Sequence, residues 1–167
     1  MKVIQFCGYK NSGKTTLIAA LIPQLKRQGM RIAVIKHDGH GFDMDREGTD
    51  TYRFREAGAE GIAIASPGRT AILRETELEL DTLIHMYTDY DMVLVEGYKR
   101  MPYPKLVLLR GMEDRGLLDQ VEEIRGVVVN PSMLKEPSGL QEIRHRLAVP
   151  LFTWNETELI ATLILSL

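Results

Sequence analysis

The sequence has a single cysteine, little net charge and no long apolar run. Because Cys7 stands alone, neither an internal disulfide nor a cysteine metal cluster can form within the chain, which fits a reducing compartment. A formal net charge of -2 leaves no basic excess of the kind that nucleic-acid binding favours. No apolar stretch reaches the roughly 20 residues of a membrane helix, and the segment before Gly8 is too short for a signal peptide. We therefore expect a cytoplasmic protein without a nucleic-acid or membrane partner.

Strand-like and helix-like segments alternate along the 167 residues. Two β-rich runs around Ser66, Pro67 and Gly68 predict a hairpin. The pattern as a whole predicts an α/β fold in a single domain over residues 1–167, with a mostly parallel sheet covered on both faces and the hairpin at one edge. The expected strands are 2–7, 31–36, 91–97, 104–109 and 126–130, and the expected helices are 14–28, 50–58, 78–87, 139–147 and 158–167.

The stretch "GYKNSGKTTL" has the spacing of a phosphate-binding loop, since Gly8 is followed four residues later by Gly13, Lys14 and Thr15. Such a loop points backbone N–H groups at a nucleotide phosphate beside the positive end of the next helix. Lys14 then reaches the β- and γ-phosphates, and Thr15 offers its hydroxyl to Mg²⁺. An ordinary strand-to-helix turn is the alternative. The nucleotide-binding residues predicted here are Gly8, Asn11, Ser12, Gly13, Lys14, Thr15 and Thr16.

A nucleotide site also needs an acid at the carboxyl end of a neighbouring parallel strand, because ligands lie outside that end of the sheet. In "DMVLVEG" the direction of the strand places Asp91 at the far edge and Glu96 beside the loop. We predict that Glu96 holds Mg²⁺ through water, together with Thr15, or orients a nucleophile as the catalytic residue. A solvated acid at the end of a strand is the alternative.

Two further polar stretches follow strands at the same edge. The first, "KHDGHGFDMDREGTD", carries Asp43, Asp45 and two histidines, which suit Mg²⁺ or anion binding; a zinc site is conceivable, although solvated loops often contain such residues. Its last residue, Asp50, could simply cap a helix. The second stretch, "EGYKRMPYPK", carries the basic side chains Lys99, Arg100 and Lys105. These could bind a second phosphorylated ligand, and a solvated basic face is the alternative.

The two motifs "GYKNSGKTTL" and "DMVLVEGYK", with "IKHDGHGFDMDREGTDTYRFREAGA" and the ending "VPLFTWNETELIATLI", resemble the molybdopterin-guanine dinucleotide biosynthesis adapter family, protein B of that pathway. The resemblance implies a three-layer phosphate-loop domain that binds GTP and Mg²⁺ and hydrolyses GTP weakly at most. It implies an adapter that assists a guanylyltransferase attaching GMP to molybdopterin. It also implies that Asp43 and Asp45 lie in a loop that faces the phosphates.

One feature of many GTP-binding proteins is missing. Instead of an Asn-Lys-x-Asp stretch, "GVVVNPSML" supplies only Asn130 as a candidate for reading guanine, so guanine selectivity depends on the resemblance. A small-molecule kinase shares the loop, but no arginine-rich lid stands out between Glu96 and Asn130, where "KRMPYPK" and "RGMEDRG" are only imperfect candidates. A regulated GTPase switch requires a water-positioning residue, and no glutamine is evident for it. The apolar hairpin predicts a homodimer through strand pairing, or else an edge protected within the monomer.

Overall fold

The computed structural model describes residues 1–135 and 137–167, which form two compact units. The first unit comprises Met1–His37 and Ile84–Leu167, and the second comprises Asp38–Leu83. Helix α3 (Leu80–His85) spans the boundary between them. The expectation of a single domain over residues 1–167 stays a prediction.

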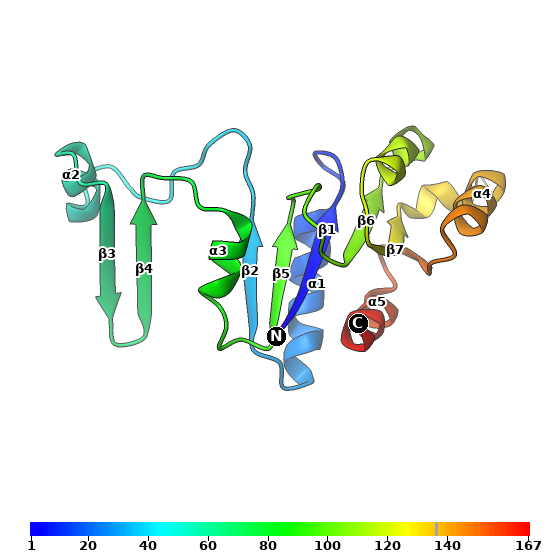
Figure 1. The fold of residues 1–167 in the computed structure, drawn as a ribbon, viewed down its shortest axis with the longest axis horizontal. Helices are drawn as coiled ribbons and strands as arrows, with labels where there is room; N and C mark the ends of the chain where they lie inside the picture. Colours follow the sequence, from blue (N-terminus) through cyan, green and yellow to red (C-terminus); the bar gives the residue numbers. More distant parts are fainter. Residues whose placement is uncertain (136) are drawn as a thin grey trace. The chain divides into compact units, whose positions relative to one another are not determined.

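The first unit is built on a six-stranded parallel sheet with the order β2-β5-β1-β6-β7-β8. Figure 1 shows β2, β5 and β1 side by side, with their arrows pointing the same way. The predicted α/β fold with a mostly parallel sheet is thereby confirmed. The strands are β1 (Lys2–Cys7), β2 (Ile32–Lys36), β5 (Met92–Glu96), β6 (Lys105–Leu109), β7 (Ile124–Val129) and β8 (Leu151–Thr153).

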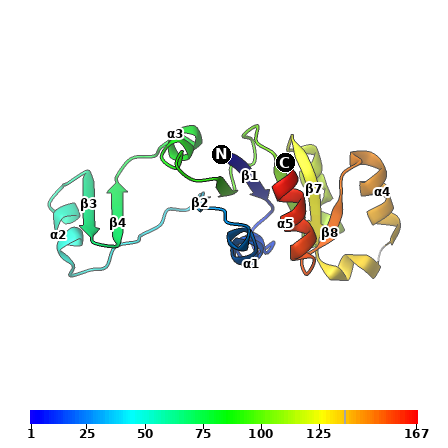
Figure 2. The same ribbon diagram turned by 90° about the horizontal axis from the view of Figure 1, so that it is seen from below.

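Strand β6 shows why the sheet is covered on both faces, because all five of its residues are buried. Leu106 and Leu108 pack into one apolar cluster and Val107 and Leu109 into another, as the alternation of side chains along a strand requires. Helices α1 (Lys14–Arg27) and α5 (Thr157–Ser166) cover the first face, and Figure 2 shows these two side by side. The short helices η1 (Met112–Asp119) and η2 (Pro131–Lys135) cover the second face with α4 (Pro137–Leu147). The predicted three layers are therefore present.

The terminal helix α5 docks on the core. Ile160 and Ile164 are fully buried against α1 and the sheet, whereas Leu159 is exposed. In the part of the chain that the structure describes, no helix combines the length and the apolar character needed to cross a bilayer.

The second unit holds helix α2 (Asp50–Glu56) and the hairpin of β3 (Gly61–Ser66) and β4 (Arg69–Arg74). The two strands pair antiparallel from Gly61 with Arg74 to Ser66 with Arg69, so the predicted hairpin is confirmed and forms a two-stranded sheet of its own. Thr49, not Asp50, caps α2, because its hydroxyl accepts a hydrogen bond from the backbone N–H of Tyr52 at 3.2 Å.

Candidate nucleotide site at the carboxyl end of the sheet

The loop between β1 and α1 folds tightly around its first glycine. A Cβ atom on Gly8 would lie 2.2 Å from the Ser12 Oγ and 3.1 Å from the Leu108 carbonyl oxygen, so a larger residue cannot occupy this position without moving the loop. Gly13 begins α1 with a φ of 83°, which a residue with a side chain rarely adopts. The loop therefore has the close backbone curl that a phosphate cradle requires.

The Lys14 ammonium group lies inside this curl. It donates to the carbonyl oxygens of Gly8 at 3.2 Å and Tyr9 at 2.9 Å, and it is 3.4 Å from the Ser12 Oγ. Partial burial lowers the pKa of Lys14, and the carboxylate of Glu96 opposes that shift. A cation at this point supplies charge at the place where the loop directs its backbone donors.

Thr15 and Glu96 are brought together from positions far apart in the sequence. The Thr15 hydroxyl is 3.0 Å from Oε1 and 2.9 Å from Oε2 of Glu96, whose side chain is only 8% exposed. The contact follows from the sheet, because Phe6 pairs with Glu96 and both β1 and β5 end at the same edge. A hydroxyl and a carboxylate at one point are oxygen ligands of the kind that Mg²⁺ prefers.

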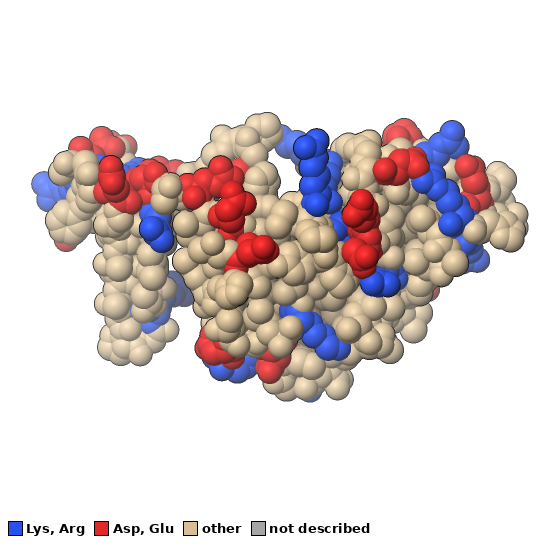
Figure 3. All heavy atoms as spheres, in the orientation of Figure 1, with Lys and Arg blue, Asp and Glu red and all other residues tan. Residues whose placement is uncertain are grey.

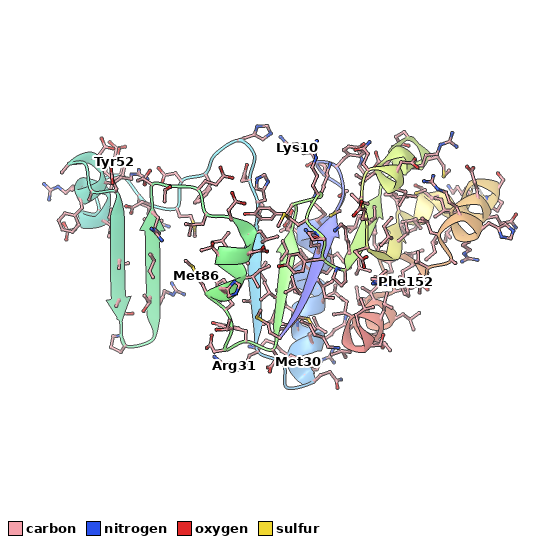
Figure 4. All side chains as sticks on the ribbon, viewed as in Figure 1. Lys10, Met30, Arg31, Tyr52, Met86 and Phe152 are labelled. Atoms are coloured by element: carbon pink, nitrogen blue, oxygen red, sulfur yellow. The ribbon has the colours of Figure 1, made fainter. Side chains whose placement is uncertain are left out.

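Asp91 lies at the other end of β5. Its Oδ2 accepts a hydrogen bond from the backbone N–H of Arg31 at 2.7 Å, in the turn that leads into β2. Figure 4 shows Arg31 at the opposite end of the sheet from Lys10, which belongs to the phosphate loop. The predicted separation of Asp91 from Glu96 is therefore present.

The other predicted loop residues have different degrees of exposure. Ser12 is fully buried, whereas Asn11 is exposed and has a left-handed backbone with a φ of 61°. Thr16 is exposed on the first turn of α1. Asn130 follows β7 at the same end of the sheet, where its Oδ1 accepts a hydrogen bond from the Ser132 backbone N–H at 2.9 Å.

Asp43 and Asp45 belong to the second unit, and their hydrogen bonds lie within it. Asp43 accepts two hydrogen bonds from Arg55, at 3.0 and 2.9 Å, and these lower the pKa of its carboxyl group. Oδ1 of Asp45 accepts from the hydroxyls of Thr49 and Thr51, whereas its Oδ2 is buried and has no hydrogen-bond partner among the described residues.

Lys105 is a correction to the sequence prediction, because it is not part of a basic surface. As the first residue of β6 it is only 1% exposed, and its ammonium group donates to Gln5 Oε1 at 2.8 Å and to the carbonyl oxygens of Met101 and Tyr103. The buried lysine holds the segment that connects β5 to β6. Lys99 and Arg100 of the same stretch remain accessible.

Arg110 begins the imperfect lid candidate "RGMEDRG", but its place beside the phosphate loop was not predicted. It follows β6 directly, and its guanidinium group lies 5.9 Å from the centre of the Tyr9 ring, while the Lys99 ammonium lies 4.4 Å from that centre. In Figure 3 basic side chains stand at the end of the molecule where Figure 1 draws the loop that follows β1. The basic side of the loop is thus formed by Lys99 and Arg110 rather than by Lys99 and Lys105.

Trp154 is a second residue whose place beside the loop was not predicted from the sequence. It follows β8, and its indole ring lies 3.8 Å from the place where a Cβ of Gly13 would be. Its Nε1 is buried without a hydrogen-bond partner among the described residues. Trp154 is the only tryptophan in the chain, so its fluorescence reports on the phosphate loop directly.

The site as a whole can hold a phosphorylated ligand. It combines a tight glycine loop, a lysine inside the loop, and a hydroxyl beside a nearly buried carboxylate at the carboxyl end of parallel strands. This donor set suits a nucleotide phosphate together with Mg²⁺.

Comparison with known proteins adds to this geometry. Residues 3–130 match the family described as molybdopterin guanine dinucleotide synthesis protein B. A molybdopterin-guanine dinucleotide biosynthesis adapter protein of Haemophilus influenzae is 41% identical over 127 residues, which cover 74% of this chain and 71% of that protein. A probable adapter protein of the same name from Bacillus subtilis is 34% identical over 142 residues, covering 83% of this chain and 82% of that protein.

A solved structure of the same family is also similar to this chain. The crystal structure of Bacillus subtilis MobB superposes with a TM-score of 0.79 at 28% identity, and the match covers 99% of this chain and 97% of that one. The family and these relatives favour the adapter over the small-molecule kinase that the loop also allowed.

Proposed function

The chain belongs to the molybdopterin guanine dinucleotide synthesis protein B family, and on that premise we propose that it binds GTP with Mg²⁺ and assists a guanylyltransferase that attaches GMP to molybdopterin. The observation that carries the proposal is the contact between Thr15 and Glu96 beside the phosphate loop. The names of the two adapter relatives support the pathway, and the geometry of the loop supports the nucleotide.

In this proposal each residue at the loop has a defined task. Backbone N–H groups between Gly8 and Thr16 hold the phosphates, Lys14 contacts the β- and γ-phosphates, and Thr15 with Glu96 holds Mg²⁺. When bound, Mg²⁺ neutralises the charge of the β- and γ-phosphates. Asn130, which follows β7 at the same end of the sheet, contacts the guanine base.

We further propose that GTP hydrolysis is weak. Fast phosphoryl transfer needs a residue that positions water, or an arginine that closes over the phosphates. Gln5 is on β1 next to Glu96's strand, but it is fully buried and its Nε2 donates to the carbonyl oxygens of Gly97 and Tyr98, at 3.3 and 2.8 Å. Arg110 is held by Asp114. Gln5 is therefore engaged in the interior and Arg110 is fixed by Asp114, and Glu96 remains the candidate for orienting a nucleophile.

The proposed assembly is a cytoplasmic homodimer that binds the guanylyltransferase. The hairpin supports dimer formation, because Ile64 is 56% exposed and Ile72 is 69% exposed. Ile64 pairs with Ala71 and Ile72 with Ala63, so the two isoleucines lie on opposite faces of the hairpin. A buried free thiol at Cys7 suits the reducing cytoplasm.

Calorimetric titration of the purified protein with GTP and ATP, each with and without Mg²⁺, tests the nucleotide part of the proposal. We expect one GTP per chain, binding that is strengthened by Mg²⁺, and at least tenfold weaker binding of ATP. Equal affinity for the two nucleotides would remove the guanine assignment. If neither GTP nor ATP binds, the phosphate-loop assignment is removed as well.

A further inference from the structure

We propose that Tyr9, Lys99 and Arg110 form a second anion site on the outer side of the phosphate loop, and that this site binds a small phosphate monoester. The inference rests on the proposed function in one respect: an adapter that brings a nucleotide to another substrate has a use for a second anionic ligand. It assigns that ligand a place at the Tyr9 ring, whereas the Lys14 ammonium group lies inside the loop.

Three neighbouring parts of the sheet bring these residues together. Tyr9 lies in the loop after β1, Lys99 in the connection after β5, and Arg110 directly after β6, and these strands are adjacent in the order β5-β1-β6. The Lys99 Nζ is 4.4 Å and the Arg110 Cζ is 5.9 Å from the centre of the Tyr9 ring. Both distances are within the range of a cation–π contact, so one aromatic ring gathers two cations.

Arg110 is held in a fixed orientation. The Asp114 carboxylate, whose side chain is 2% exposed, accepts from the Arg110 Nε at 2.8 Å, from its Nη2 at 2.6 Å and from its backbone N–H at 3.0 Å. The remaining nitrogen, Nη1, is 3.4 Å from the carbonyl oxygen of Lys10. These contacts use three of the five guanidinium N–H donors, and two are left for a ligand.

The segment that carries Lys99 is fixed by buried polar groups. Gln5 donates to the carbonyl oxygens of Gly97 and Tyr98, and Lys105 donates to Gln5 and to the carbonyl oxygens of Met101 and Tyr103. Tyr98 is held with a left-handed φ of 51°. Burial of a glutamine and a lysine costs free energy unless they are hydrogen-bonded, and here their bonds order the backbone on both sides of Lys99. Two ordered cations beside the loop are a preorganised site rather than a solvated face.

The charge of this site favours an anion. Asp114 balances Arg110, whereas no carboxylate in residues 1–135 and 137–167 lies within 4.0 Å of the Lys99 ammonium group. The uncompensated charge of Lys99 attracts a phosphate monoester, which carries close to two negative charges at neutral pH. The oxygens of such a group accept the donors that Lys99 and Arg110 leave free.

The test uses protein saturated with Mg²⁺ and a non-hydrolysable GTP analogue, so that the phosphate loop is filled. Phenyl phosphate and inorganic phosphate are then titrated separately and followed by calorimetry. We expect one equivalent of phenyl phosphate to bind, more tightly than inorganic phosphate, and Lys99→Met to weaken it at least tenfold. The matched control is Arg100→Met, which removes an adjacent exposed cation and should change the affinity less than twofold. Lys99→Met should melt at the temperature of the wild-type protein.

Three results would overturn the site. The first is unchanged binding of phenyl phosphate by Lys99→Met, and the second is an equal loss of phenyl phosphate affinity in Lys99→Met and Arg100→Met. The third is a loss of affinity for the GTP analogue in Lys99→Met, because that would assign Lys99 to the nucleotide. If inorganic phosphate binds more tightly than phenyl phosphate, the ligand of this site is not a phosphate monoester. If the GTP analogue fails to bind the wild-type protein, the proposed function fails instead. The second site is then tested in nucleotide-free Lys14→Ala, where its phosphate binding should persist and should again be lost on adding Lys99→Met.

Discussion

The exchange of Glu96 for glutamine tests the proposed metal-binding end of β5 against the other end of the strand. Glu96→Gln keeps the size of the side chain and removes the negative charge that lies 2.9 and 3.0 Å from the Thr15 hydroxyl. Asp91→Asn makes the same chemical change at the start of the strand, where the carboxylate contacts the Arg31 backbone. The two variants therefore differ in position along one strand and in little else.

The expected loss follows from the surroundings of the carboxylate. Glu96 is 8% exposed, so water screens its charge poorly, and its loss should cost about 1.5 to 3 kcal/mol, the scale of a hydrogen bond to a charged group. That corresponds to a loss of roughly ten- to hundredfold in affinity for the Mg²⁺–nucleotide complex. Asp91 is exposed, and its replacement should change the affinity less than twofold.

Fluorescence of Trp154, which lies beside Gly13, provides the assay together with calorimetry. GTP is titrated with and without Mg²⁺ against the wild-type protein and the two variants. Glu96→Gln should lose most of the gain that Mg²⁺ provides, while binding without Mg²⁺ stays similar. A larger loss in Asp91→Asn, or equal losses in both, would refute the assignment of the metal site to the carboxyl end of β5.

Three other changes have defined outcomes. Lys14→Ala should lose roughly 2 to 3 kcal/mol of Mg²⁺–nucleotide binding in calorimetry with an unchanged melting temperature, since Lys14 is outside both apolar clusters; unchanged affinity would contradict the loop assignment. Arg110 lowers the pKa of Asp114, so the stability from this pair is complete above an ordinary carboxyl pKa of about 4 and is lost as the pH falls through the lowered value. Asp114→Asn should unfold in urea with about 2 kcal/mol less free energy at pH 7 and lose less on acidification, and parallel pH profiles would count against the pair. Light scattering at micromolar concentration should give a dimer mass that Ile64→Lys with Ile72→Lys reduces to a monomer, and a monomeric wild-type protein would end the proposal of a hairpin-mediated dimer.

The phosphate loop and its acid could be predicted from the sequence because both follow from local rules. The spacing of Gly8, Gly13 and Lys14 lies within a few residues, and the direction of a parallel strand alone distinguishes Glu96 from Asp91. Alternating apolar runs were also sufficient for the order and type of the main helices and strands. The short strand β8 was missed, since three residues after Pro150 carry too little pattern to identify.

Lys105 shows where local reasoning fails. A lysine beside a proline in a polar stretch is ordinarily solvated, and only the position of β6 between β1 and β7 places it in the interior. Its partners come from β1 and from the segment that precedes it, and Gln5 is 100 residues away in the sequence. A polar residue at the start of a strand buried on both faces is the signal that could have indicated its burial.

The positions of Arg110 and Trp154 beside the loop were not predicted, for a related reason. Each follows a strand at the carboxyl edge, and each acquires its place beside the loop only when β6 and β8 take their positions in the sheet. Residues immediately after parallel strands therefore deserve to be considered together when a site is predicted, whether or not they form a motif.

Formation of the guanine dinucleotide cofactor by the guanylyltransferase, measured from molybdopterin and Mg²⁺–GTP with and without this protein, tests the adapter function most directly. The wild-type protein should increase the yield of the dinucleotide cofactor. Lys14→Ala should lose most of that increase, whereas Lys10→Ala, in the same loop but exposed to solvent, should retain it. No increase with the wild-type protein, or an equal increase with Lys14→Ala, would contradict a role that depends on GTP binding at this loop.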